Sequence, residues 1–130
     1  MNSLAEYGQR RVLVVEDNRD TAEILRQLLA HCGYEVVVTH SGQQGLEGAR
    51  RLQPHVVLCD IGLPDSDGYA VGSVLRQSGQ APRARLIALT GHGAPDDRRR
   101  ALAAGFDQHL VKPVDTKVLL LEIEAETKWT

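Results

Sequence analysis

Three carboxylates of this chain follow apolar runs of the kind that form buried strands. Asp60 comes directly after VVLC at 56–59, and Glu16 and Asp17 come directly after VLVV at 12–15. Carboxylates that share a small, partly dry site repel one another, so either their pKa values rise or a cation lies among them. Oxygen-only ligation suits Mg²⁺ far better than zinc. The residue types therefore predict a magnesium site beside Asp60.

Two further polar residues hold matching positions after other apolar runs. Thr90 follows LIAL at 86–89, and Lys112 follows HLV at 109–111. Ligands of open parallel sheets bind at the carboxyl ends of the strands, so these side chains are expected at the same edge as Asp60. A divalent cation, an ammonium and a hydroxyl around one carboxylate would stabilise a phosphoryl group during its transfer.

Taken one at a time, the same residues have simpler interpretations. Glu16-Asp17 alone would fit a charge pair at a helix N-terminus, which the helix dipole favours. Thr90 alone would fit a strand-end hydroxyl, and Lys112 alone a solvated surface lysine. Their shared positions after apolar runs favour the site over these alternatives.

The elements that must position these residues form a regular series. Apolar runs without alternation indicate strands covered on both faces, as in a parallel sheet. A weaker fifth strand is expected at 35–39. Helices are expected over 20–32, from a capping box at Ser41 and Gln44 to before Pro54, and over 68–78, 95–104 and 115–127. Strands alternating with helices predict an α/β fold, a doubly wound (βα)₅ parallel sheet with helices on both faces.

The bulk properties are those of one ordinary globular domain. The chain has 130 residues, 42% of them hydrophobic and 25% charged, with a net charge of −2. This balance gives no basis for direct nucleic-acid binding or membrane insertion. The amino terminus lacks the apolar core of a signal peptide, so a cytoplasmic location is expected. Cys32 and Cys59 are too few for a disulfide framework or a zinc site, and both are predicted to be buried.

In their order along five β-α units, the strand-end residues Glu16-Asp17, Asp60, Thr90 and Lys112-Pro113 resemble those of a known family. They are similar to the receiver domain of bacterial two-component response regulators. The resemblance covers about residues 10–126, with loose tails at 1–9 and 127–130. It implies a flavodoxin-like receiver fold with strand order 2-1-3-4-5. It also implies a phosphoacceptor switch that catalyses only its own phosphorylation and dephosphorylation.

The resemblance implies roles for the acidic residues. Asp60 would accept a phosphoryl group from a phosphohistidine on a histidine kinase or histidine phosphotransfer protein. Asp17 and Asp60 would ligate Mg²⁺, or Mn²⁺ in its place, directly. Glu16 would act through water, and the backbone carbonyl of Gly62 would complete the protein ligands.

The remaining site residues would bind the phosphoryl group and report its arrival. Thr90 and Lys112 would each contact phosphoryl oxygens, and the Lys112–Pro113 peptide bond would be cis. Many family members carry Tyr or Phe three positions before the lysine, where this chain has His109. We expect His109 to act with Thr90 as the switch through its rotamer. The coupling to the surface is expected either to be smaller than with an aromatic ring or to depend on pH, because imidazole titrates near neutrality.

The resemblance also sets the expected partners. Besides the phosphodonor, a downstream protein partner is expected, with the domain a monomer or weak dimer. The phrases DIGLPDSDGY and LIALTGHG resemble receivers of hybrid sensor histidine kinases more than those of DNA-binding regulators. Two rival functions stay open: a receiver-like binding module without phosphorylation, and an aspartyl-phosphate phosphohydrolase. The second rival would place an aspartate where this chain has Gly62.

Some residues near the site and at the end of the chain are less specific. Gly62 and His92 would flank the place of a hydrolytic water. The basic run Arg98 to Arg100 is expected to be a solvated helix face, with partner docking as the alternative. The last helix has more apolar residues than one buried stripe needs, and the surplus, Leu120 or Ile123, is expected to be exposed. Trp129 is expected in the loose tail.

Overall fold

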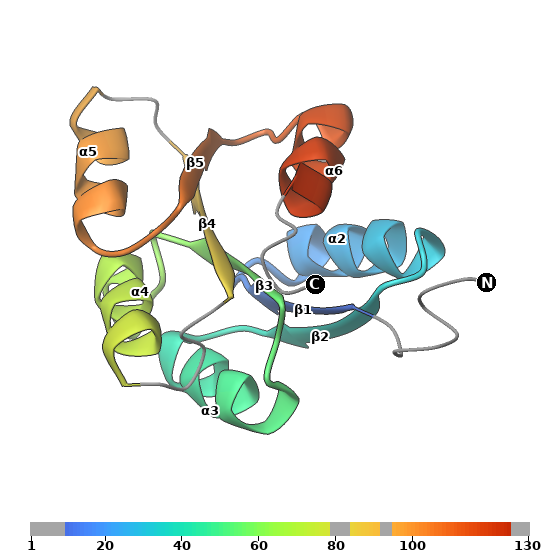
Figure 1. Ribbon diagram of the computed structural model, residues 1–130, viewed down its shortest axis with the longest axis horizontal. Helices are drawn as coiled ribbons and strands as arrows, with labels where there is room; N and C mark the ends of the chain where they lie inside the picture. The colour runs from blue at the N-terminus through green and yellow to red at the C-terminus, as the bar shows by residue number, and fades with distance from the viewer. Residues whose placement is uncertain (1–9, 79–83, 92–94, 126–130) are drawn as a thin grey trace.

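The computed structural model describes residues 10–78, 84–91 and 95–125, which alternate between strands and helices along the chain (Figure 1). The strands are β1 (Arg11–Val15), β2 (Glu35–Thr39), β3 (Val56–Asp60), β4 (Arg85–Thr90) and β5 (Gln108–Val111). The helices are α2 (Arg19–His31), α3 (Gly42–Leu52), α4 (Gly68–Gln77), α5 (Pro95–Ala103) and α6 (Thr116–Ala125). The predicted tails, with Trp129, and also His92 lie outside the described residues.

The five strands form one parallel sheet in the order β2-β1-β3-β4-β5. This confirms the predicted fold class and strand order. The chain leaves β1 toward β2 on one side and returns to β3 on the other. Such a reversal opens a crevice at the carboxyl ends of the two strands. The carboxyl ends of β1 and β3 carry the predicted carboxylates.

Helices cover both faces of the sheet, as Figure 1 shows, with α2 and α6 on one side and α3, α4 and α5 on the other. Alternate residues of each strand enter opposite cores. Leu13 and Val57 pack in the core under α3 and α4, and Val14 and Leu58 pack in the core under α2 and α6. Two buried layers therefore hold the strand ends in place.

Side-chain caps set where three helices begin. The Asn18 side chain accepts a hydrogen bond from the Thr21 amide, and Asp67 caps α4. Ser41 accepts from the Gln44 amide at 3.1 Å, as the predicted capping box requires. The carboxamide of Gln44, however, accepts from the amide of His40, one residue before the cap. The Gln44 side chain therefore bonds to the amide before the cap residue and not to the amide of the cap residue itself.

The predicted boundaries differ from the observed ones mostly by one residue. Asp60 and Thr90 are the last residues of their strands instead of the first residues after them. The first helix runs from Arg19 to His31, and Cys32 is its C-cap. The prediction that Cys32 is buried is wrong, because Cys32 lies at the C-terminal end of α2, beyond the last buried residue of that helix, Leu29. Cys59, within β3, is buried as predicted.

The surplus apolar residues of the last helix are not the ones that were expected. Ile123 is fully buried together with Leu119, four residues earlier, because this pair faces the sheet. The expectation that Ile123 is exposed is therefore wrong, and Leu120 is only partly exposed. The exposed apolar residues of α6 are Val118 and Leu121. Within the described part of the chain, no helix is long and apolar enough to cross a membrane.

Candidate phosphoacceptor site

The three predicted carboxylates meet at the carboxyl edge of the sheet. Each of Glu16, Asp17 and Asp60 offers one oxygen, and these oxygens lie within 4.8 Å of one another. Glu16 is fully buried and Asp60 nearly so, whereas Asp17 is exposed. The cluster is thus open to solvent on the side of Asp17 and closed beneath.

Lys112 joins this cluster from the end of β5. Its Nζ donates to Glu16 Oε1 at 2.6 Å and to Asp60 Oδ2 at 3.0 Å. The peptide bond between Lys112 and Pro113 is cis. The ammonium therefore lies between residues that are 96 and 52 positions away in the sequence.

The loop after β3 is held tightly against the Asp60 backbone. The Gly62 amide donates to Asp60 Oδ1 at 2.9 Å, so both carboxylate oxygens of Asp60 have donors. The Gly68 amide, at the start of α4, donates to the carbonyl of Ile61. A Cβ on Gly68 would lie 2.6 Å from the carbonyl oxygen of Asp60. Only glycine permits this close approach.

The same loop is anchored on a second helix by Asp65. Its carboxylate accepts from the amides of Gly42 and Gln43 at 2.8 and 3.2 Å, at the N-terminus of α3. These amides have no partners within their own helix, so the bonds satisfy them and lower the pKa of Asp65. Sequence reasoning missed this role, since nothing in the pattern pairs Asp65 with α3.

For each of the two buried carboxyl groups, burial raises the pKa and hydrogen-bond donors lower it. Burial raises the pKa of Glu16, and the hydrogen bond from Lys112 offsets this only in part. Burial also opposes ionisation of Asp60, but the donors Gly62 and Lys112 outweigh it and lower the Asp60 pKa. The two carboxylates likewise overcome burial and raise the pKa of Lys112. The lowered pKa keeps Asp60 ionised at neutral pH, and Glu16 is the weaker acid of the pair.

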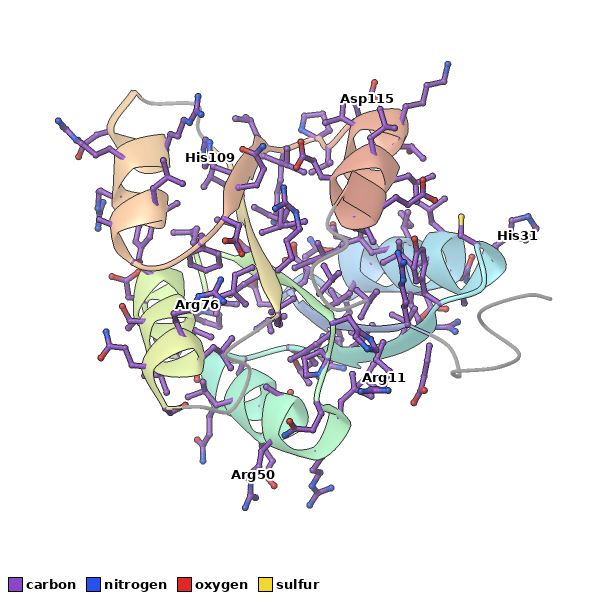
Figure 2. All side chains as sticks on the ribbon, in the orientation of Figure 1. Arg11, His31, Arg50, Arg76, His109 and Asp115 are labelled. Atoms are coloured by element: carbon purple, nitrogen blue, oxygen red, sulfur yellow. The ribbon has the colours of Figure 1, made fainter. Side chains whose placement is uncertain are left out.

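Thr90 and His109 lie together on neighbouring strands of the same edge. Thr90 Oγ1 and His109 Nε2 are 2.9 Å apart, which is hydrogen-bond distance. His109, a residue of β5, is labelled in Figure 2. The structure thus brings the two predicted switch residues into direct contact.

A cleft of about 350 Å³ opens beside Asp60. Among the residues that line it are Asp60, Thr90, Lys112, Tyr69, Asp97 and Arg100. The last three come from α4 and α5 and were not predicted to be near the site. For Asp97 and Arg100, the sequence indicates only that a spacing of three residues places both on one side of a helix that follows β4. A larger hollow of about 1020 Å³ lies over α3 and β2, away from these carboxylates.

Comparison with known proteins agrees with this geometry. The model of the response regulator receiver domain family matches residues 12–124. An uncharacterised 14.6 kDa protein of Leptolyngbya boryana is 33% identical over 113 residues, which are 87% of this chain and 86% of that protein. The transcriptional regulatory protein HprR of Escherichia coli K12 is 34% identical over 91% of this chain. The chain spans 52% of HprR, about half its length.

Solved structures show the same fold. A CheY-like receiver domain protein from Methanospirillum hungatei superposes with a TM-score of 0.84 at 28% identity, covering 90% of this chain and 92% of that one. The receiver domain of the sensor histidine kinase PA1611 of Pseudomonas aeruginosa superposes with a TM-score of 0.82 at 30% identity. The superposition covers 90% of this chain and 96% of that one. The PA1611 receiver domain has a magnesium ion coordinated in its active-site cleft. This chain belongs to the response regulator receiver domain family of two-component signalling.

Proposed function

We propose that Asp60 is the phosphoacceptor of a two-component phosphorelay and that its phosphorylation changes partner binding. The observation that carries this proposal is the set of contacts on one carboxylate. Asp60 accepts from Lys112 and Gly62 and lies within 4.8 Å of two further carboxylates. The donor is a phosphohistidine on a histidine kinase or histidine phosphotransfer protein.

The transfer step conserves atoms and charge, and the second ring nitrogen of the donor's imidazole carries a proton so that the ring leaves as neutral imidazole. One carboxylate oxygen of Asp60 forms a new bond to phosphorus while the bond from phosphorus to the donor's imidazole nitrogen breaks. The imidazole nitrogen keeps the electron pair. Asp60 suits this role because its lowered pKa keeps it ionised. The Lys112 ammonium balances charge on the phosphoryl oxygens.

The acidic cluster fits a divalent cation. Its ligand atoms are all carboxylate oxygens close to one another, and one of the three residues is exposed to solvent. Hard ions such as Mg²⁺ and Mn²⁺ prefer this donor set. Asp17 and Asp60 would hold the ion directly, Glu16 through water, and the Gly62 carbonyl as a further ligand. When bound, the ion supplies positive charge at the phosphoryl oxygens.

We further propose that Thr90 and His109 transmit phosphorylation to the surface. A hydroxyl has one proton to donate, so in the tautomer in which His109 Nε2 accepts from Thr90, the hydroxyl cannot also donate to a phosphoryl oxygen. Phosphorylation draws the Thr90 hydroxyl toward the acceptor, and the His109 ring then changes its rotamer. In a beryllofluoride complex, NMR shifts at Thr90 without any at His109 would contradict this proposal.

The two rival functions lack this support. An aspartyl-phosphate phosphohydrolase would need a second carboxylate two residues after the nucleophile, and that position is Gly62. A binding module without phosphorylation would not need Lys112 between two carboxylates. Resemblance alone favours a hybrid sensor kinase as the parent protein, and the comparisons include a transcriptional regulator as well as a sensor kinase.

The test is phosphorylation by acetyl phosphate with Mg²⁺, followed by intact-mass measurement. We expect a gain of about 80 Da, the mass of one HPO₃ unit, in the wild type. Asp60→Asn should show no gain. Asp67→Asn is the matched control, because asparagine preserves the α4 cap and Asp67 lies on the same loop.

Each outcome separates the candidate functions. A gain in the wild type and in Asp67→Asn, but not in Asp60→Asn, supports the phosphoacceptor. No gain in the wild type favours the binding module. Steady release of inorganic phosphate from a small phosphate ester would favour the phosphohydrolase.

A further inference from the structure

The outer wall of the acceptor cleft carries a cation that the proposed function has not used. Arg100, on α5, lines the cleft together with Asp60 and Lys112. Its guanidinium carbon lies 4.4 Å from the centre of the Tyr69 ring, within the range of a cation-π contact. Tyr69 is nearly buried in the first turn of α4. The ring therefore forms a firm platform that directs an otherwise exposed side chain.

The charge of Arg100 is available to a ligand. Arg99, its neighbour, pairs with Asp96, but Arg100 forms no ion pair with the residues that the structure describes. Asp97 lies one turn before Arg100 and accepts a hydrogen bond from the Tyr69 hydroxyl at 3.5 Å. Its charge is thus at the hydroxyl end of the ring, whereas Arg100 lies over the ring face.

Charge balance at the acceptor favours a second cationic side chain. Three carboxylates carry three formal negative charges, which Lys112 and one divalent cation would balance. An incoming phosphoryl group adds about −1.5 to −2. Guanidinium groups suit phosphate oxygens because their donors form a planar fork.

We propose that Arg100 is a specificity-determining residue that binds the phosphoryl group of a small dianionic donor, such as an acyl phosphate, in this cleft. The inference rests on Asp60 as acceptor. In the transfer, the bond between phosphorus and the acyl oxygen breaks, the carboxylate leaves with the electron pair, and the bond from phosphorus to Asp60 forms. Tyr69 is a positioning residue, since it acts through Arg100.

The experiment measures the rate of Asp60 phosphorylation against acetyl phosphate concentration. Arg100→Ala should raise the acetyl phosphate concentration for half-maximal rate about fivefold, which is at the upper end for one exposed charge. Arg98→Ala is the control, because it removes the same charge from an exposed position on the same helix. It should change the concentration for half-maximal rate by less than about twofold. Higher salt should reduce the difference between the two variants.

Two further variants test the platform. Tyr69→Phe keeps the ring and should behave as the wild type, whereas Tyr69→Leu should resemble Arg100→Ala. Circular dichroism checks whether Tyr69→Leu is folded. If it is not, the comparison of Arg100→Ala with Arg98→Ala decides the proposal.

If Arg100→Ala and Arg98→Ala have the same acetyl phosphate concentration for half-maximal rate, and the wild type is phosphorylated normally, the role of Arg100 is overturned. The proposed function would stand. No phosphorylation of the wild type would overturn the proposed function and this inference with it.

Discussion

Removal of the Lys112 ammonium is the most direct test of the electrostatics of the site. In Lys112→Met the side chain keeps nearly the same length, but Glu16 and Asp60 lose a donor at 2.6 and 3.0 Å. Glu16 is fully buried, and the Lys112 side chain is 27% exposed. Breaking a buried ion pair costs about 3–5 kcal/mol, and the partial exposure of Lys112 favours the lower end, about 3 kcal/mol.

Most of that cost should come from the carboxylate of Glu16. In a Glu16→Gln background no buried Glu16 charge remains, and Asp60 still accepts from the Gly62 amide. There Lys112→Met should cost only about 1 kcal/mol, the scale of one ordinary hydrogen bond. The coupling between the two substitutions is therefore about 2 kcal/mol, well above the scatter of about 0.5 kcal/mol for independent sites.

The measurement is urea unfolding of the four proteins of this cycle, followed by circular dichroism at pH 7 with EDTA. Lys117→Met is the control, because Lys117 is an exposed lysine on α6, and it should change stability by less than about 0.5 kcal/mol. Added Mg²⁺ should reduce the penalty of Lys112→Met, since a bound cation replaces the lost charge. Additive effects of the two substitutions would refute the view that Lys112 chiefly serves Glu16.

Three further predictions concern the metal site, acid stability and the core. Asp17→Asn should weaken Mg²⁺ binding about tenfold or more in calorimetry, because it removes a direct carboxylate ligand. Burial, with the charge of Arg11 nearby, lowers the pKa of His55, whose Nδ1 accepts from the Arg11 amide at 2.9 Å. The unfolded chain then binds more protons, so stability should fall as pH drops through about 6.5 and level off below the folded pKa. Gly72→Ala should cost about 1–2 kcal/mol in urea unfolding, because its Cβ would lie 2.3 Å from the Phe106 ring, despite the better helix propensity of alanine.

Each of these predictions has a matched comparison. Asp20→Asn alters an exposed aspartate near Asp17 and should leave Mg²⁺ affinity nearly unchanged; an equal loss there would point to net charge alone. His55→Asn offers an acceptor near the Nδ1 position and should reduce the fall in folding stability below about pH 6.5. An unchanged fall would exclude His55 as its source. In a Phe106→Leu background, Gly72→Ala should become neutral or stabilising, and an unchanged cost would exclude the ring as the cause.

Local features of the sequence carry information about the fold because they act within one element. Continuous apolar runs predict buried parallel strands, and Ser41 marks the start of α3 through a bond to an amide three residues away. The carboxyl ends of parallel strands share one edge, so a polar residue at each end can be assigned to one site. For this reason Asp60, Thr90 and Lys112 could be named without coordinates.

Tertiary contacts could not be read in the same way, because they depend on how each helix is rotated and how it crosses the sheet. Cys32 was expected to be buried and Ile123 to be exposed, yet Cys32 is exposed and Ile123 is buried. The anchor from Asp65 to α3 joins residues more than 20 positions apart. No local pattern specifies such a pair.

By itself, the sequence determined the strand series, the sheet order implied by family resemblance and the polar residues at the carboxyl edge. Only the tertiary structure decided that Lys112 lies between Glu16 and Asp60, that His109 contacts Thr90, and that Arg100 stacks on Tyr69 at the cleft. The physical reason is that periodicity specifies which side of an element is buried, whereas distances between side chains of different elements arise only when those elements pack together.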